Sequence, residues 1–229
     1  NAELLIDHAW GWEPCTIEMI KNYHPENSSL SEGQVLTRPY SYKEATVIVK
    51  EMADVLALNL TAKGLLTRQI VLTIGYDVES LKDPKILKKY SGEVHLDWYG
   101  RAVPKHAHGT ANLERQTSSS KLITEGAMEI FQRTVNADLL VRRVTIAADK
   151  VVAREEGEED SKEEQLSLFS KPEEEKIRDE ERLRKELALQ EATLSIKRKY
   201  GKNAILKGIN YEEGATGRER NRQIGGHRA

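Results

Sequence analysis

The sequence predicts an α+β fold, a four-stranded sheet in the order β-α-β-β-α-β with both helices on one face. Arg68–Tyr76 alternates between apolar and polar residues, as a strand with one buried face does. Before it, apolar residues from Ala45 to Leu60 recur with the 3.6-residue period of an amphipathic helix. A similar strand, helix and strand pattern returns over residues 109–147. Together these two halves predict one sheet with one buried face.

The first half has clear boundaries in the sequence. Gln34–Tyr40 is predicted to be the first strand, ended by Pro39. Ser41 is a favourable N-cap, and Glu44 three residues later completes a capping box, so the first helix begins here. This helix is expected to stop near Gly64.

The second half repeats the pattern. Gly109–Thr117 is predicted to be the third strand and Leu139–Ala147 the fourth. Between them, Ser118 or Ser119 is expected to cap a helix. The side chains expected on its inner face are Ile123, Ala127, Ile130, Phe131 and Val135.

Residues 77–108 form a connection that is long for a compact domain, which indicates a functional role. Lys85–Tyr90 is expected to form one helical turn, and a hairpin is expected around His95–Tyr99. His95, Asp97, His106 and His108 are residue types that bind metals, but their irregular spacing does not favour a metal site.

With both helices on one face, the other face of the sheet is expected to be uncovered. This face is either an ordinary solvated surface or a surface that lies against a polyanion. The residues expected on it include basic and hydroxyl side chains: Arg68, Thr73, Arg115, Thr117, Arg143 and Thr145.

The composition favours a globular part joined to an extended charged part. The chain has 229 residues, of which 38% are hydrophobic and 31% are charged, which is too polar for one compact domain of this length. Its apolar runs are too short for a membrane span, and no signal peptide is visible. Cys15 is the single cysteine, which fits a reducing, cytoplasmic setting, and we expect it to be a buried thiol.

The net charge of −2 hides an uneven distribution. Residues 1–35 carry one Lys or Arg against six Asp and Glu, and residues 151–200 carry eleven against fifteen. Residues 36–150 carry seventeen against thirteen. A moderately basic module between acidic flanks can sit beside phosphates, because local charge decides such contacts.

The two ends of the chain differ from this module. Residues 4–10 and 16–23 are predicted to be short helices, and residues 24–34 a linker of turn-forming residues. Glu173–Tyr200 is predicted to be one charged helix with a thin apolar stripe, either solvated or ordered only by contacts. A coiled coil is the alternative, although the heptads do not run long enough. Residues 201–229 show no clear core.

The isolated apolar peptide Gln165-Leu166-Ser167-Leu168-Phe169 lies in the acidic stretch before this helix. It resembles the sliding-clamp-binding motif of bacterial DNA polymerases and repair proteins. An apolar peptide among charged residues cannot bury itself locally and is available to a partner. The alternative is the start of the next helix, with Leu166 and Phe169 on one face. The clamp-binding residues of this interpretation are Gln165, Leu166, Ser167, Leu168 and Phe169.

Several segments together resemble the C-terminal half of UmuC-like Y-family translesion DNA polymerases. Asn1–Gly11 resembles the end of their thumb domain, and Ser31–Leu36 resembles the entry to their little-finger domain, which the β-α-β-β-α-β order also matches. Other segments are similar to the Gram-positive branch of that group: Tyr99–Lys105, His108–Thr110, Asn203–Gly208 and Gln223–His227.

The resemblance implies four regions. Residues 1–33 are the end of the thumb and a linker, and residues 34–150 are the little-finger DNA-binding domain. Residues 151–172 are an acidic linker with the clamp motif, and residues 173–229 are a charged helix and tail. The implied partners are template–primer DNA, the sliding clamp and further repair or SOS proteins, but no membrane.

The resemblance also implies which residues contact DNA. The little finger grips backbone phosphates through strand amides, hydroxyls and basic side chains, without reading the bases. The residues of this chain that match such a role are Arg38, Arg68, Lys105, His108, Arg115, Thr117, Ser118, Ser119, Lys121, Arg142 and Arg143.

We expect the polymerase activity to reside in the full-length parent. Polymerases of this family hold metal ions, here expected to be Mg²⁺, with palm carboxylates that precede the thumb. Asp54, Asp77 and Asp97 are scattered and do not form such a cluster, and the chain starts at Asn1 rather than Met. We therefore expect an inactive fragment with no cofactor of its own. Two alternatives are a non-catalytic, clamp-recruited adaptor and a ferredoxin-like module with an unrelated ligand.

Overall fold

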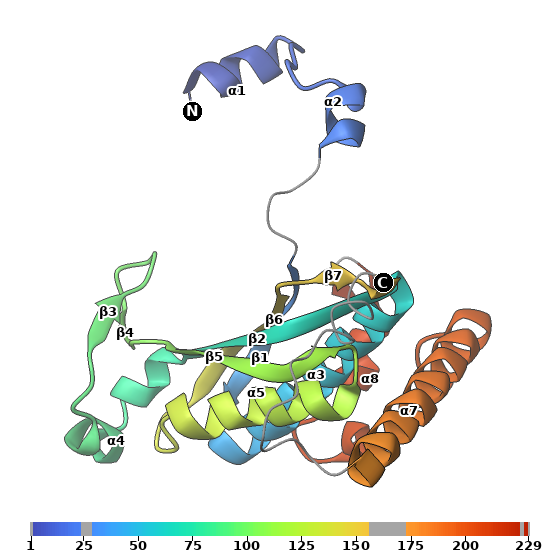
Figure 1. Cartoon of the computed structure of the whole chain (residues 1–229). Coiled ribbons are helices and arrows are strands. Elements are labelled where there is room, and N and C mark those ends of the chain that lie inside the picture. The colour runs from blue at the N-terminus through green and yellow to red at the C-terminus, as the bar shows by residue number, and fades with distance from the viewer. Residues whose placement is uncertain (1, 24–28, 156–172, 225–226, 229) are drawn as a thin grey trace.

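The structure, a computed structural model, describes residues 2–23, 29–155, 173–224 and 227–228 (Figure 1). Its main sheet has the strand order β1-β6-β2-β5, and every neighbouring pair is antiparallel. These strands are β1 (Leu30–Tyr40), β2 (Leu65–Tyr76), β5 (Ala107–Thr117) and β6 (Val141–Asp149). The predicted α+β class and the β-α-β-β-α-β order are both confirmed.

Helices α3 (Tyr42–Lys63) and α5 (Ser120–Thr134) cover one face of this sheet (Figure 1). The predicted capping box is present: the Ser41 hydroxyl accepts from the Glu44 amide, and the Glu44 carboxylate accepts from the Ser41 amide. Ser119 caps α5 by accepting from the Leu122 amide at 3.2 Å. These caps fix where each helix leaves its strand, and so which side chains point at the sheet.

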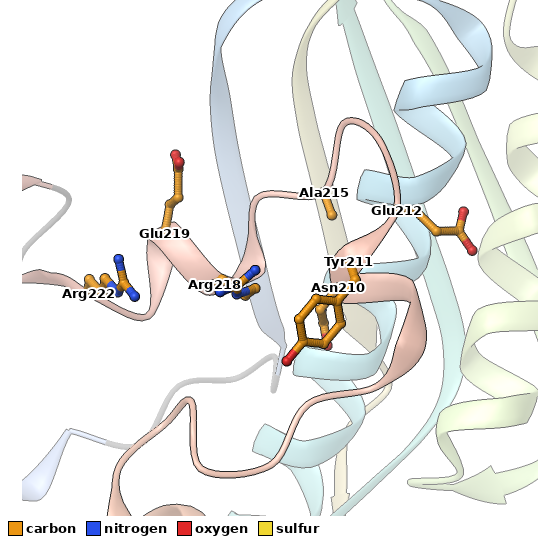
Figure 2. Close-up of a pocket in the computed structure, with 7 residues that line it drawn as sticks. All are labelled: Asn210, Tyr211, Glu212, Ala215, Arg218, Glu219 and Arg222. Atoms are coloured by element: carbon orange, nitrogen blue, oxygen red, sulfur yellow. The ribbon is translucent and has the colours of Figure 1, made fainter.

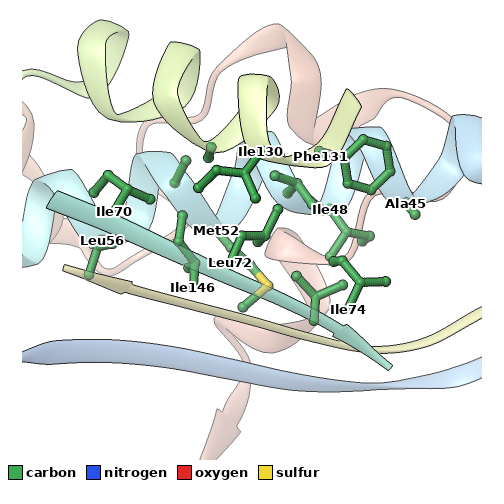
Figure 3. Close-up of a cluster of buried hydrophobic side chains, with 14 of the residues drawn as sticks. Ala45, Ile48, Met52, Leu56, Ile70, Leu72, Ile74, Ile130, Phe131 and Ile146 are labelled. Atoms are coloured by element: carbon green, nitrogen blue, oxygen red, sulfur yellow. The ribbon is translucent and has the colours of Figure 1, made fainter. Parts of the chain in front are cut away.

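The core lies between the sheet and these two helices (Figure 3). Ile70, Leu72 and Ile74 of β2 are buried on the face that meets the helices, as their alternation predicts. Phe131 of α5 is fully buried, and its ring centre lies 4.7 Å from that of Tyr42. Because the core lies on this face alone, the side chains between these positions point to the other face.

Three strands begin earlier than predicted, because their first residues still pair with neighbours. Leu30 pairs with Ala148, so β1 begins four residues earlier than predicted, whereas β6 begins and ends two residues later than predicted. A fifth short strand, β7 (Val152–Ala153), pairs with the first residues of β2. It continues the pairing of β6 along β2 after Lys150, which has a φ of 53°.

The connection between β2 and β5 has structure of its own. It contains a 3₁₀ turn, η1 (Val78–Leu81), and a short helix, α4 (Pro84–Lys89), close to the predicted helical turn. The strands β3 (Val94–Leu96) and β4 (Ala102–Pro104) form the expected hairpin.

The N-terminal helices α1 (Ala2–Ala9) and α2 (Ile17–Asn22) lie close to the predicted ranges, and neither contains a buried residue. Trp10 and Trp12 between them are exposed. The expectation that Cys15 is buried is wrong, because nothing in the described chain packs over this segment and the thiol is exposed.

The helix α7 (Glu173–Tyr200) packs against the domain through polar contacts. The Gln190 amide donates to the Ser118 carbonyl at 3.0 Å, and Glu186 accepts from the Ser119 hydroxyl at 2.7 Å. Arg154, beyond β7, lies 3.4 Å from Glu191. The helix can therefore pack on the domain with only a thin apolar stripe, because hydrogen bonds and ion pairs hold it in place.

Residues 201–224 also pack on the domain, against the outer side of α3. They include η3 (Gly208–Tyr211), α8 (Gly217–Arg220) and β8 (Gln223–Ile224), which pairs with β9 (His227–Arg228). Glu51 of α3 is 4% exposed and accepts hydrogen bonds from the Asn210 side chain at 2.6 Å and the Thr216 amide at 2.8 Å. The segment thus has no apolar core of its own but is bound to a buried carboxylate.

A second polar contact anchors the same segment. The Lys207 ammonium lies 2.5 Å from Asp54 of α3 and 3.1 Å from the Ser120 hydroxyl at the start of α5. One lysine therefore joins the C-terminal segment to both core helices.

Across the described residues, no helix is long and apolar enough to cross a membrane.

Candidate nucleic-acid interface

The face of the main sheet opposite α3 and α5 is uncovered by any described element, and we call it the open face (Figure 1). The strand register places Gly33, Thr145, Thr73 and His108 in one row across the four strands. Within this row, the Thr73 hydroxyl lies 2.9 Å from Nδ1 of His108. The centre of the open face therefore consists of small and hydrogen-bonding groups.

The rows on either side have the same character. The register places Val35 and Arg143 beside Gly75 on one side, and Ser31, Ala147, Val71 and Thr110 on the other. Most open-face side chains are small or uncharged, and the charged ones among those that the register places there are Arg143 and Asp149. The open-face residues are Ser31, Gly33, Val35, Gln69, Val71, Thr73, Gly75, His108, Thr110, Asn112, Arg143, Thr145, Ala147 and Asp149.

Three of the six residues expected on this face are there: Thr73, Arg143 and Thr145. The expected positions of Arg115 and Thr117 are wrong. Arg115 lines a pocket between β5, α5 and α7, and Thr117 is buried. The cause is a bulge, since Thr67 and Gln69 of β2 pair with Thr117 and Asn112 of β5, which leaves extra residues on β5. Arg68, between the two pairing positions on β2, is exposed.

The predicted DNA contacts at the start of α5 are engaged within the protein. Ser118 and Ser119 are buried beside α7, where Glu186 accepts from both the Ser119 hydroxyl and the Lys121 amide. Lys121 itself is exposed, with its ammonium 3.9 Å from Glu125. A role in DNA contact stays a prediction for these residues, and it requires α7 to leave the serines.

Other basic candidates lie around the rim of the sheet and pair with carboxylates. The Lys105 ammonium lies 2.8 Å from Glu93, and Arg142 lies 3.7 Å from the buried Asp77. Of the eleven candidates, His108 and Arg143 are the two that the register places on the open face.

Arg38, near the end of β1, donates a short hydrogen bond to Glu44 and lies over the Tyr40 ring. This hydrogen bond, with those from Ser41, lowers the pKa of Glu44 from 4.5 to about 2. A carboxyl group with a lowered folded-state pKa stabilises the fold above its unfolded pKa, and this stabilisation is lost as the pH falls toward the folded value.

Replacing Glu44 with glutamine is therefore expected to reduce the loss of stability on acidification. Urea unfolding at about pH 5 and about pH 3 measures this difference. Glu129→Gln, at an exposed site 3.5 Å from Arg133, is the matched control and should keep the full acid dependence. Equal slopes for the unmodified chain and Glu44→Gln would contradict the assignment.

The open-face residues that were not predicted can be identified from the periodicity of the strand. Once Ile70, Leu72 and Ile74 are placed inward, the two-residue period of a strand turns Gln69, Val71 and Gly75 outward. The expectation instead favoured basic residues, and only the pairing register shows that the face is nearly free of charge.

A pocket of about 290 Å³ lies within the C-terminal segment (Figure 2). Its lining combines Arg218 and Arg222 with Glu212 and Glu219, and Arg218 lies 4.8 Å from the centre of the Tyr211 ring. Acidic and basic groups balance here, so the pocket does not select a charged ligand.

Within the described ranges, no group of three or more His, Cys, Asp or Glu residues is placed to hold a metal ion.

A family model described as the impB/mucB/samB family C-terminal domain matches residues 27–168, which is more than half of the chain. The chain belongs to this family. The match supports the resemblance to the C-terminal region of Y-family DNA polymerases, and it covers the whole main sheet. No curated protein matches the chain. The predicted clamp-binding residues Gln165–Phe169 lie outside the described residues.

Proposed function

We propose that this chain is the non-catalytic C-terminal part of an error-prone translesion DNA polymerase of the cytoplasm, which grips template–primer DNA and recruits the sliding clamp. The open face of the main sheet carries this proposal. It is four strands wide, and both core helices lie on the opposite side (Figure 1). The family match supports the origin from a polymerase.

The chemistry of the open face suits the sugar–phosphate backbone. Small side chains allow the DNA backbone to approach the strands closely, and the Thr145 and Thr110 hydroxyls can donate to phosphate oxygens. Arg143 adds a positive charge. Such contacts position a duplex without reading its bases, which suits an enzyme that accepts damaged template.

The rim residues point to modest affinity. Arg38, Lys105 and Arg142 each pair with a carboxylate. A phosphate must compete with these carboxylates, and the resulting contacts weaken as salt rises. We therefore expect duplex binding that is weak at physiological salt and falls steeply as the salt concentration increases.

Replacing Thr145 with glutamate is expected to lower duplex affinity about tenfold at low salt, because a carboxylate beside a phosphate costs about 1–2 kcal/mol. The site has room for the longer side chain, since Gly33 lies opposite and a β-carbon there would be 3.8 Å from the Thr145 hydroxyl. Fluorescence anisotropy with a labelled blunt duplex measures the change.

Gln132→Glu is the matched control for this experiment. It makes the same change in charge on an exposed position of α5, in the layer behind the sheet. Its effect on affinity should be within about twofold at the same ionic strength, because the charge lies farther from the DNA. Equal losses for the two variants, or binding that does not depend on salt, would refute the open face as the binding surface.

We extend the proposal to the clamp motif at Gln165–Phe169. A polymerase with few DNA contacts dissociates quickly, and attachment to a ring on the duplex raises its local concentration there. The apolar peptide among acidic residues supports this role.

A further inference from the structure

The β3–β4 hairpin stands beyond one end of the main sheet, on the side away from α5 (Figure 1). Its strands are short, with Val94 opposite Pro104 and Leu96 opposite Ala102. The base of the hairpin is fixed by a hydrogen bond from the Lys105 amide to the Glu93 carbonyl at 2.8 Å. In Figure 1 the hairpin rises on the side of the sheet that carries the open face.

The turn at the tip is held by Asp97. The Asp97 carboxylate accepts from the amides of Tyr99 and Arg101, both at 2.9 Å, and from Nε of Arg101 at 2.7 Å. The Asp97 amide donates to the Arg101 carbonyl at 2.8 Å, and Gly100 adopts a φ of 72°, which favours glycine. The hydrogen bonds from Arg101 lower the pKa of Asp97, so this carboxylate remains charged and the turn remains closed.

Trp98 and Tyr99 occupy the middle of this turn and are 95% and 80% exposed. Such positions usually carry Gly, Pro, Asn, Asp or Ser. Two large aromatic side chains in solvent are unfavourable for an isolated domain, and adjacent exposed aromatics mark an interaction site. Because the turn is already fixed, binding at Trp98 and Tyr99 costs little conformational entropy.

The connection that carries the tip has a positive net charge. Residues 82–108 carry six Lys and Arg against three Asp and Glu. The basic group beside the tip is the Arg101 guanidinium, 5.1 Å from the centre of the Tyr99 ring, whereas the exposed Lys85, Lys88 and Lys89 belong to α4, which lies away from the tip (Figure 1). Aromatic rings beside basic groups match a strand that offers both phosphates and flat base faces.

We propose that Trp98 and Tyr99 stack on unpaired bases of single-stranded DNA that adjoins a duplex on the open face. The proposal rests on the proposed function, because the duplex brings the single strand to the hairpin. The preference is for unpaired over paired DNA rather than for a sequence, since every base presents a face for stacking.

The test compares two probes with the 229-residue chain: a blunt duplex, and the same duplex with an oligothymidine extension on the template strand. The unmodified chain should bind the extended duplex more tightly. The double variant Trp98→Ala, Tyr99→Ala should bind the extended duplex about tenfold more weakly and the blunt duplex equally well. The pair Trp98→Phe, Tyr99→Phe keeps the ring faces and should retain most of the preference.

Leu96→Ala controls for the loss of apolar surface, since Leu96 is 73% exposed on the same hairpin. It should leave both affinities unchanged. In a chain with Trp10→Phe and Trp12→Phe, the fluorescence of Trp98 should be quenched by oligothymidine. Absence of quenching, or equal binding of the extended duplex by the double variant, would overturn the stacking proposal. If the unmodified chain binds neither duplex, the proposed function itself fails.

Discussion

Replacing Leu168 and Phe169 with alanine is expected to abolish binding of the chain to a bacterial sliding clamp. Burial of one Leu or Phe side chain contributes about 1.5–3 kcal/mol, so loss of both lowers the affinity by a factor of at least about one hundred. The surrounding segment carries Glu155, Glu156, Glu158, Glu159, Asp160, Glu163 and Glu164 and offers few other apolar anchors. Surface plasmon resonance with immobilised clamp measures the loss.

Ser170→Ala is the control for this double variant. Ser170 directly follows the motif Gln165–Phe169 and is not one of its residues. This variant should bind normally, and both variants should keep the far-UV circular dichroism and duplex affinity of the unmodified chain. Persistent clamp binding by the double variant would show that another surface makes the contact.

Replacing Glu51 with alanine is expected to release residues 201–224 from α3 and to lower the free energy of unfolding by about 3 kcal/mol. Glu51 is nearly fully buried and accepts from the amides of Thr216 and Gly217 and from the Asn210 side chain. Without the carboxylate, these donors lose their partner. Amide hydrogen exchange at Thr216 and Gly217 should become fast, and trypsin should cut at Arg218 and Arg220.

Two further variants sharpen this experiment. Glu125→Ala, at an exposed site of α5, should change stability by less than about 0.5 kcal/mol. Gly217→Ala should act in the same direction as Glu51→Ala, because a β-carbon at residue 217 would lie 2.7 Å from the Glu51 carboxylate. If exchange at Thr216 stays slow in Glu51→Ala, Lys207 and its contact with Asp54 hold the segment instead.

The elements of the sheet could be predicted because local patterns specify them. The alternation of Ile70, Leu72 and Ile74 and the capping box at Ser41 depend on neighbouring residues only. The bulge in β5 could not be predicted, because it depends on pairing with β2, and it moves Arg115 from the open face to the pocket beside α7.

The packing of the C-terminal segment could not be predicted for a different reason. Its contacts join Glu51 to Thr216 and Asp54 to Lys207, which are far apart in the sequence and follow no hydrophobic period. A charged residue in a helix is usually solvated, so nothing local distinguishes the buried Glu51 from an exposed glutamate.

Part of the candidate site was also unpredictable, because its geometry depends on contacts that no local sequence pattern specifies. The exposed aromatic tip at Trp98 and Tyr99 lies inside a connection that was expected to be functional. The exposure of these two side chains could be identified only from the structure of the turn. Ser119 shows the opposite case: its N-cap role follows from the sequence, whereas its partner Glu186 on α7 does not.

The return of α7 and residues 201–224 to the domain affects any shortened version of this protein. A chain cut after residue 160, which removes the motif Gln165–Phe169, would also leave Glu51 and Gln190's partner Ser118 facing water, and Asp54 without Lys207. Deletion mapping would then mix lost recruitment with a weakened scaffold, so point substitutions are the cleaner way to divide the two.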